Sequence, residues 1–308
     1  VEFANALVQI VQTLVVILFG VYLIRREIIT IDVWIAFYLY ADMIFSRFNS
    51  MMEIWKGFKQ SQGALSRVLE AVNVEEEISQ GNLPVSTAND LSFENVSFAY
   101  ENDMVLKNVS FKIKANAMNA LVGPSGSGKS TILLLMDQLY SSYQGKIILD
   151  GHEARNYELS GFRNQFCFID QETPLFGGTV RDNILYGLKR EVSEDELLSA
   201  CKKAGAFEFI EALPNGLDSM MLVAGNNFSG GQKQRLALIR AMLTDRPFIL
   251  LDESLASVDM ISAKQVFKEL KELTSDKTII FVTHSMELAR LADEIIVISD
   301  GEINGSGY

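Results

Sequence analysis

Residues 123–131 (GPSGSGKST) constrain the fold of this chain more than any other stretch of its sequence. They follow a short apolar run at 117–122, which predicts a strand, and precede an apolar run at 132–139, which predicts a helix. Strand, glycine-rich loop and helix in this order form the phosphate-binding P-loop pattern. The glycines let backbone N–H groups converge on a phosphate, which the helix N-terminus also attracts. We expect Lys129 to reach the β- and γ-phosphates of a nucleotide, and the Ser130 hydroxyl to bind Mg²⁺.

Two carboxylates end a second apolar run, at 248–253 (FILLDE). A buried strand that ends in an acid beside a P-loop is expected to place Asp252 near Mg²⁺. Glu253 follows directly and is positioned to polarise the water that attacks the γ-phosphate. These two acids make phosphate chemistry the leading interpretation of the P-loop.

A further helix N-terminus is predicted at 227–232 (NFSGGQ), ahead of a helical run at 233–243. Ser229 is a favourable N-cap residue, and the two glycines after it leave the helix end accessible. The chain therefore carries two helix ends suited to phosphate. One nucleotide cannot use both within a compact domain unless a second copy of the chain supplies one of them.

The order of apolar runs predicts the fold around these motifs. Residues 91–100 and 105–113 alternate apolar and polar side chains, as half-buried antiparallel strands do. From 117 onward short apolar strands alternate with helical stretches, which indicates an α/β domain with a parallel sheet. A polar stretch at 79–90, with Gly81 and Pro84, is predicted to be a linker.

Two apolar segments precede the linker. Residues 6–24 contain no charge and approach the length of ~20 residues that spans a bilayer. Residues 33–45 are apolar apart from Asp42 and carry aromatic side chains suited to a membrane interface. We predict two antiparallel spans, at about 6–24 and 33–50. The second is expected to continue as an amphipathic helix with mixed composition at 47–77.

Asp42 within the second predicted span has two interpretations: it lines a substrate path, or it sits in a wet bundle interior without a specific role. Charged residues in the flanking loops do not fix the orientation of the spans. The nucleotide motifs do, because ATP chemistry belongs in the cytosol, so residues 25–32 are expected to face outward.

Charge and cysteine content exclude other classes of protein. A net charge of -12 argues against a surface that binds the phosphate backbone of nucleic acid. Cys167 and Cys201 lack metal-ligand spacing and are expected to be reduced thiols in a cytosolic domain. His152, in DGHE, is expected to be a surface residue.

The P-loop, Ser-Gly-Gly-Gln and Leu-Leu-Asp-Glu, in this order and spacing, resemble the ATP-binding cassette (ABC) family over about 91–308. The resemblance implies a P-loop α/β fold with an antiparallel β subdomain and a helical subdomain. It also implies a head-to-tail dimer of two cassettes, in which the Ser-Gly-Gly-Gln segment of one copy completes the ATP site of the other. The partner is a second copy or a homologous half-transporter.

The resemblance assigns further roles. Tyr100 matches an aromatic residue that stacks on adenine, Gln171 a glutamine that approaches Mg²⁺, and His284 a switch histidine that contacts the γ-phosphate. The expected catalytic residues are Glu253, His284 and Gln171, and the expected Mg²⁺ ligands are Ser130, Gln171 and Asp252. The residues expected to bind ATP are Tyr100, Gly123, Ser125, Gly126, Ser127, Gly128, Lys129, Ser130, Thr131, Ser229, Gly230, Gly231, Gln232 and Asp259.

The predicted spans resemble the exporter branch of the family, in which a helical membrane domain and a cassette share one chain. We therefore expect a multi-pass protein of the plasma or inner membrane, in contact with lipid, with its cassette in the cytosol. Residues 1–78 would be the C-terminal part of a membrane domain whose four earlier spans lie before Val1. Exporters usually carry a glutamate just before the Ser-Gly-Gly segment, and 221–227 has no carboxylate. Coupling through that contact is therefore in question.

Three other functions stay open. An importer cassette would normally be a separate chain without spans. An ATP-gated regulator would bind ATP without turnover and would not need both Glu253 and His284. A soluble cassette protein would require 6–46 to be a water-soluble helical arm. The sequence does not identify the cargo: peptide, lipid and drug-like molecule all remain open.

Overall fold

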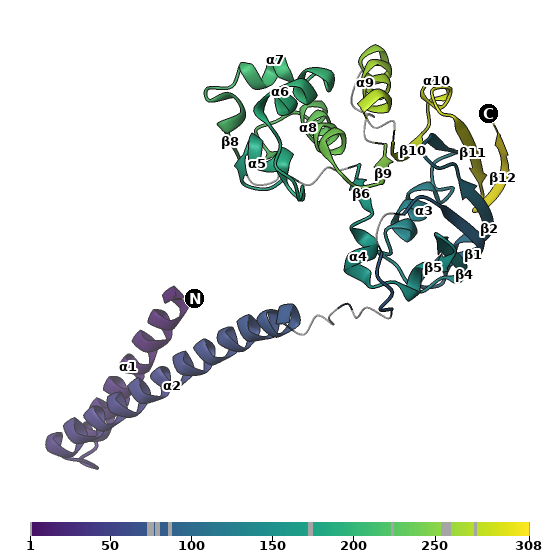
Figure 1. The fold of residues 1–308 in the computed structure, drawn as a ribbon. Helices are drawn as coiled ribbons and strands as arrows, with labels where there is room; N and C mark the ends of the chain where they lie inside the picture. Colours follow the sequence, from purple (N-terminus) through teal and green to yellow (C-terminus); the bar gives the residue numbers. More distant parts are fainter. Residues whose placement is uncertain are drawn as a thin grey trace. The chain divides into compact units, whose positions relative to one another are not determined.

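The computed structural model describes residues 2–72, 77, 81–85, 88–171, 175–222, 225–253, 260–273 and 276–307. The chain divides into two compact units, Val1–Glu77 and Ile78–Tyr308. The first is a helical hairpin and the second is a mixed α/β unit (Figure 1).

The helical hairpin consists of α1 (Glu2–Arg25) and α2 (Ile31–Val72). Glu27 in the turn between them has a φ of 55°, in the left-handed region. The helices approach closely at Gly20, which is buried: a Cβ atom added there would lie 1.6 Å from Nε1 of Trp34. A small residue at this point lets the two backbones come together.

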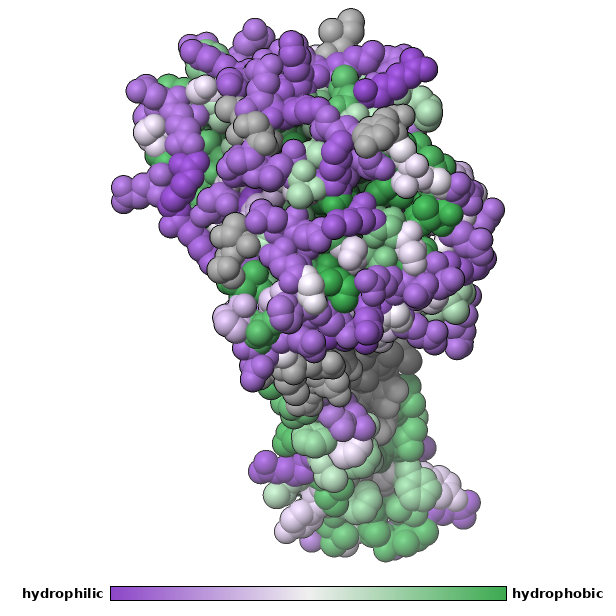
Figure 2. All heavy atoms as spheres, turned by 45° about the vertical axis from the view of Figure 1, so that its right-hand side comes forward, coloured by the Kyte–Doolittle hydropathy of each residue, from purple (hydrophilic) through white to green (hydrophobic). Residues whose placement is uncertain are grey.

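Much of the apolar surface of the hairpin is exposed. The exposed fractions reach 67% for Leu18 in α1 and 74% for Ile54 in α2, and the apolar residues are coloured green in Figure 2. Residues 6–24 and 33–50 are helical, as predicted. Within the part of the chain that the structure describes, no helix combines the length and the apolar character needed to cross a bilayer.

The α/β unit begins with a four-stranded antiparallel sheet in the order β2-β1-β4-β5. Both strands predicted from alternation are present, with Leu91, Phe93, Val96 and Phe98 of β1 buried. The alternation slips between Phe93 and Val96, where the register between β1 and β2 shifts. The strands are β1 (Leu91–Tyr100), β2 (Asp103–Ile113), β4 (Gln144–Leu149) and β5 (His152–Glu153).

A six-stranded sheet follows, in the order β12-β11-β3-β10-β9-β6. All its neighbouring pairs are parallel except β11 and β12. Parallel strands bring their carboxyl ends to one edge of a sheet, where α/β folds bind ligands. The strands are β3 (Met118–Val122), β6 (Phe166–Ile169), β9 (Phe248–Asp252), β10 (Thr278–Thr283), β11 (Glu294–Ser299) and β12 (Glu302–Gly307).

The six-stranded sheet separates two hydrophobic cores. In β10, Ile279 and Phe281 join the core shared with α8, whereas Ile280 and Val282 join the core shared with α3 and the antiparallel sheet. Because successive side chains of a strand point to opposite faces, a strand buried on both faces is apolar at every position. This explains the continuous apolar runs that the sequence shows at these strands.

The helices and short elements complete the unit (Figure 1). The short strands β7 and β8 pair with each other, and α5, α6, α7 and α8 form a helical subdomain beside them. The elements are α3 (Lys129–Met136), η1 (Ala154–Asn156), α4 (Leu159–Arg163), β7 (Gly178–Thr179), α5 (Val180–Leu185), α6 (Glu194–Lys203), α7 (Phe207–Glu211), η2 (Gly216–Asp218), β8 (Met220–Met221), α8 (Gly230–Leu243), α9 (Met260–Leu273) and α10 (Met286–Ala289). The predicted α/β class, with an antiparallel and a helical subdomain, is confirmed.

Candidate nucleotide-binding site

The loop between β3 and α3 has the backbone conformation that its glycines permit. Gly126 and Gly128 have φ values of 77° and 102°, in the region that side chains disfavour. Gly123 lies against β11: a Cβ atom there would be 2.0 Å from the carbonyl oxygen of Ile298. The loop therefore needs glycine at these positions for its own conformation and packing, before any ligand is considered.

Lys129, the first residue of α3, is 4% exposed. Its ammonium group donates hydrogen bonds to the carbonyl oxygens of Gly123 and Pro124, at 3.0 and 2.7 Å. Burial lowers the pKa of this amine below its ordinary value, although the nearby charges of Glu253 and Asp252 oppose the shift. A buried ammonium that contacts neutral carbonyls inside its own loop is well suited to bind a phosphate.

The hydroxyl of Ser130 donates a hydrogen bond to Oδ1 of Asp252, at 3.0 Å. This contact joins the start of α3 to the end of β9, and so brings together two of the residues that the sequence predicts as Mg²⁺ ligands. Burial raises the pKa of the Asp252 carboxyl; the charges of Glu253 and Asp170 add to this shift, and the Ser130 hydrogen bond opposes it. Asp170 reaches the site because β6 lies beside β9 in register. We did not assign Asp170 from the sequence, since sheet order is not visible there.

Glu253 and His284 are in direct contact, through Oε1 and Nε2. The other ring nitrogen of His284, Nδ1, lies 3.2 Å from the carbonyl oxygen of Gly123. Glu253 has a φ of 44°, which is uncommon for a residue other than glycine. Such backbone conformations concentrate at functional sites. Two of the three residues predicted as catalytic, Glu253 and His284, therefore adjoin each other and the P-loop.

Two more hydroxyls belong to this site. The Ser127 hydroxyl is buried and has no hydrogen-bond partner in the described part of the chain. The Tyr100 hydroxyl lies 3.3 Å from Oγ1 of Thr131, and its ring makes edge contacts with Phe98 and Tyr140, with centroids at 4.8 and 5.2 Å. The predicted adenine-stacking residue is thus fixed next to the P-loop by an aromatic cluster that includes Tyr140, which we did not assign from the sequence.

The predicted segment at 229–232 forms a different local structure. Ser229 caps α8: its hydroxyl accepts from the N–H of Gln232 at 3.3 Å, while its own N–H donates to Oε1 of Gln232 at 2.9 Å. Among the described residues, no hydrogen bond or ion pair joins 229–232 to 123–131. Ser229 is exposed, so the helix end is accessible. One copy of the chain does not bring the two helix ends together.

The remaining predicted positions are less informative. Gln171 is exposed just after β6, and its backbone N–H donates to Oδ1 of Asp170 at 2.7 Å. Asp259 lies outside the described residues. In the loop that lacks the expected glutamate, Asn227 accepts a hydrogen bond from the N–H of Leu222 at 3.1 Å. Phe228, where leucine is usual, is 8% exposed and packs in the core of the helical subdomain.

The groups gathered at this site suit a polyphosphate with a divalent cation. They are the P-loop backbone, Ser127, Lys129, Ser130, Asp252 and Glu253. With the sheet order, they define the α/β unit as a P-loop nucleotide-binding domain. The family described as ABC transporter matches residues 106–256. Residues 106–256 therefore form a domain of the ABC transporter family, as the resemblance implied.

Similar proteins are exporters and flippases. An ATP-dependent lipid A-core flippase of Photorhabdus laumondii subsp. laumondii is 38% identical over 258 residues, which cover 83% of this chain and 44% of the flippase. A protein of the same description from Mannheimia succiniciproducens is 44% identical over 184 residues, which cover 60% of this chain and 32% of that protein. The chain thus spans less than half the length of these curated relatives.

A solved structure extends the similarity to the helical hairpin. A bacterial Atm1-family ABC exporter with ATP bound has a TM-score of 0.72 and 26% sequence identity to this chain. The match covers 99% of this chain and 55% of that exporter.

Proposed function

We propose that this chain hydrolyses ATP to drive export of a substrate across a membrane, as part of a dimeric ABC transporter. The observation that carries the proposal is the convergence of three pairs of groups at one sheet edge. These are the buried Lys129 ammonium with its loop carbonyls, Ser130 with Asp252, and Glu253 with His284. Phosphoryl transfer requires a positive cradle, a metal-binding pair and a group that orients water, and each pair suits one of these tasks.

The P-loop binds the nucleotide in this proposal. Lys129 exchanges the carbonyl oxygens of Gly123 and Pro124 for phosphate oxygens, with little loss, because neither carbonyl carries a net charge. The buried hydroxyl of Ser127 gains a partner at the same time. Tyr100, held beside Thr131, stacks on the adenine.

The carboxylates divide the remaining work. Ser130 and Asp252, with Gln171 nearby, would hold Mg²⁺, which supplies positive charge to the β- and γ-phosphate oxygens when it is bound. Glu253 orients a water molecule in line with the γ-phosphorus and accepts its proton as the new P–O bond forms. The bond to the bridging oxygen breaks, and ADP and phosphate leave. His284 holds Glu253 on one side and faces the P-loop on the other.

A second copy of the chain, or a homologous half-transporter, completes each site. The N-terminus of α8 is accessible and attracts anions. It is formed by Ser229, Gly230, Gly231 and Gln232. Their own hydrogen bonds keep this end ordered within one copy. In a head-to-tail dimer this end would face the γ-phosphate held by the other P-loop, with Asp259 at the contact.

The helical hairpin would anchor the cassette to the bilayer. We assign residues 6–24 and 33–50 to membrane spans, and 1–78 to the end of a membrane domain in contact with lipid. The assignment is supported by exposed apolar side chains along both helices, since exposed patches of this kind mark contacts with membranes or other proteins. The α/β unit would then lie in the cytosol. The similar proteins include flippases for lipid A-core.

The test is ATP turnover by the full 308-residue chain, beside Glu253→Gln and the surface control Glu94→Gln, over a range of protein concentrations. We expect Glu253→Gln to lower turnover by about 100-fold or more while ATP binding is kept, as when one transition-state contact is removed. Wild-type turnover should rise more than proportionally with protein concentration. ATP binding without turnover in the wild type would contradict the proposed ATP-driven motor and favour an ATP-gated regulator.

A further inference from the structure

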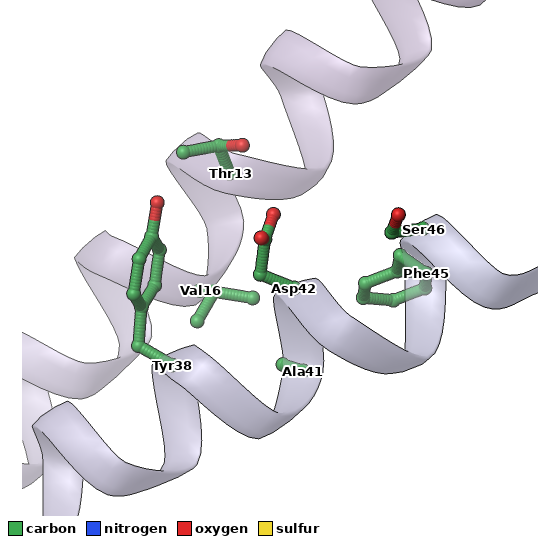
Figure 3. A pocket seen from close by; sticks show the side chains of 7 residues that line it. All are labelled: Thr13, Val16, Tyr38, Ala41, Asp42, Phe45 and Ser46. Carbon is green, nitrogen blue, oxygen red and sulfur yellow. The ribbon is translucent and has the colours of Figure 1, made fainter.

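A small polar cavity lies between α1 and α2 of the helical hairpin. Its lining combines the carboxylate of Asp42, three hydroxyl groups and two aromatic rings among apolar side chains (Figure 3). Asp42 is exposed and extends from α2 toward the side where α1 presents Thr13, and the cavity, which is partly open, has a volume of about 30 Å³. The lining residues are Thr13, Val16, Tyr38, Ala41, Asp42, Phe45 and Ser46.

Helical spacing explains why these groups meet. Tyr38 and Ser46 lie four residues before and after Asp42, and Phe45 lies three residues after it, so all share one face of α2. Thr13 completes the cavity from α1. The result is a carboxylate flanked by hydroxyls along a surface that is otherwise apolar.

Asp42 has no charged partner in this setting. Among the described residues it makes no hydrogen bond or ion pair, and the described lining contains no lysine, arginine or histidine. At 1.5 Å per residue, Asp42 lies about 12–14 Å from each end of the proposed span 33–50, near the middle of a bilayer. An ionised carboxylate at that depth is unfavourable without a partner, and such residues typically mark ion or substrate pathways.

The chemistry of the lining selects among cations. One carboxylate balances one positive charge, so a divalent metal ion would remain under-neutralised. Hydroxyl oxygens accept hydrogen bonds, which favours a cation with N–H groups. The cavity volume of about 30 Å³ exceeds the ~10–15 Å³ that a single water molecule needs, so a compact ammonium head also fits. Aromatic faces at Tyr38 and Phe45 add attraction for a cation.

We propose that this cavity binds the primary ammonium group of an amphipathic amine, so that the cargo class includes molecules with a free amino group. The inference rests on the proposed membrane location of the hairpin. The ammonium donates hydrogen bonds to the Asp42 carboxylate and the surrounding hydroxyls, and the rest of the molecule lies along the apolar surface of the helices.

The binding test uses the full chain in lipid nanodiscs and three probes with one alkyl tail: dodecylamine, dodecyltrimethylammonium and dodecanol. Dodecylamine should bind best, because only it has both charge and N–H donors. Asp42→Asn should weaken its binding by about tenfold or more, the effect of one charge-assisted hydrogen bond. The control Asp32→Asn, an acid on the same helix outside the cavity, should bind it as the wild type does. Equal binding of dodecanol, or unchanged binding by Asp42→Asn, would overturn the proposal.

A second measurement needs no variant. A hydrophobic carbodiimide that modifies carboxyl groups should label Asp42 in the wild-type chain, as read by peptide mass spectrometry. Dodecylamine bound beside Asp42 should attack the activated carboxyl, expel the urea and leave a dodecylamide in place of the carbodiimide adduct, whereas dodecanol should leave that adduct unchanged. The same adduct in the presence of either probe would contradict the proposal. Nanodiscs with and without phosphatidylethanolamine distinguish the source of the amine, since competition by this lipid would identify a lipid head group.

ATP turnover, measured on the same samples, separates this inference from the proposed function. Turnover that persists when amine binding fails would overturn the amine site and leave the ATP-driven motor intact. Amine binding that depends on Asp42, without any ATP turnover, would support the amine site and overturn the ATP-driven motor.

Discussion

Asp252 shows how function and stability oppose each other at a single residue. The pKa of its carboxyl is raised above 3.8, mainly by burial, so the folded chain holds the proton more tightly than the unfolded chain does. Ionisation therefore lowers the free energy of unfolding, progressively as pH rises from about 4 through the folded-state pKa. At pH values above the folded-state pKa, the loss in the free energy of unfolding no longer changes with pH. In the proposed function the site keeps this destabilising charge because Asp252 binds Mg²⁺ in its ionised form.

The first prediction follows from the destabilising effect of the ionised Asp252 carboxylate. Asp252→Asn keeps an oxygen that accepts from Ser130 and removes the buried charge, so the nucleotide-free chain should be more stable than the wild type at pH 7. The difference should shrink as pH falls toward 4. Urea unfolding at several pH values measures it, and turnover should be lost in the same variant. A variant less stable than the wild type at pH 7 would show that attraction to Lys129 outweighs burial.

At the scale of elements, the N-terminus of α8 has a structural and a proposed catalytic task. Ser229→Ala removes the cap and should lower the free energy of unfolding by about 1 kcal/mol. Ser193 caps α6 in the same way, accepting from the N–H of Glu196, and provides a matched control. Both alanine variants should lose similar stability by urea unfolding, but only Ser229→Ala should lose ATP turnover. Equal turnover in both variants would show that Ser229 acts only as a helix cap.

The pair of helices α1 and α2 depends on one close approach. At Gly20 a Cβ atom would meet the Trp34 ring at 1.6 Å, whereas a Cβ atom at Gly57 meets nothing within 4 Å. Gly20→Val should therefore weaken the pairing by about 1–3 kcal/mol, as overpacking does, and Gly57→Val should not. With Trp55 replaced by phenylalanine, acrylamide quenching of Trp34 reports the change. Unaltered quenching in Gly20→Val would mean that the helices do not pair at this point.

The sequence predicts elements better than it predicts their neighbours. The P-loop, the carboxylates at the end of β9 and the cap at Ser229 depend on spacing within a few residues, and the structure contains all three. Asp170 enters the site only because β6 lies beside β9, and Tyr140 only because the chain returns to β1. Such contacts depend on sheet order and core packing, which local patterns do not encode.

At the scale of the whole molecule, the proposed dimer can be tested by mixing two inactive variants. Lys129→Ala and Ser229→Ala should each abolish turnover alone. Mixed in equal amounts, they should recover about a quarter of wild-type turnover, because half of the dimers are mixed and each of those keeps one intact site.

The control for this experiment mixes Lys129→Ala with Glu253→Gln. Both residues belong to the same side of the shared site, so no intact site forms and turnover should stay absent. Recovery in the control, or none in the first mixture, would contradict a site shared between two chains.

The packing of Gly123 against Ile298 also has a consequence during synthesis. The backbone N–H of Met118, in β3, donates a hydrogen bond to Oδ2 of Asp293, which lies 175 residues later in the chain. At ~5–20 residues per second, a ribosome needs about 9–35 s to make that stretch. Throughout that interval β3 and the P-loop have emerged without β10 and β11, their eventual neighbours. A nascent chain of this kind exposes apolar strands for many seconds, and we expect its yield in cells to depend on chaperones that bind it during translation.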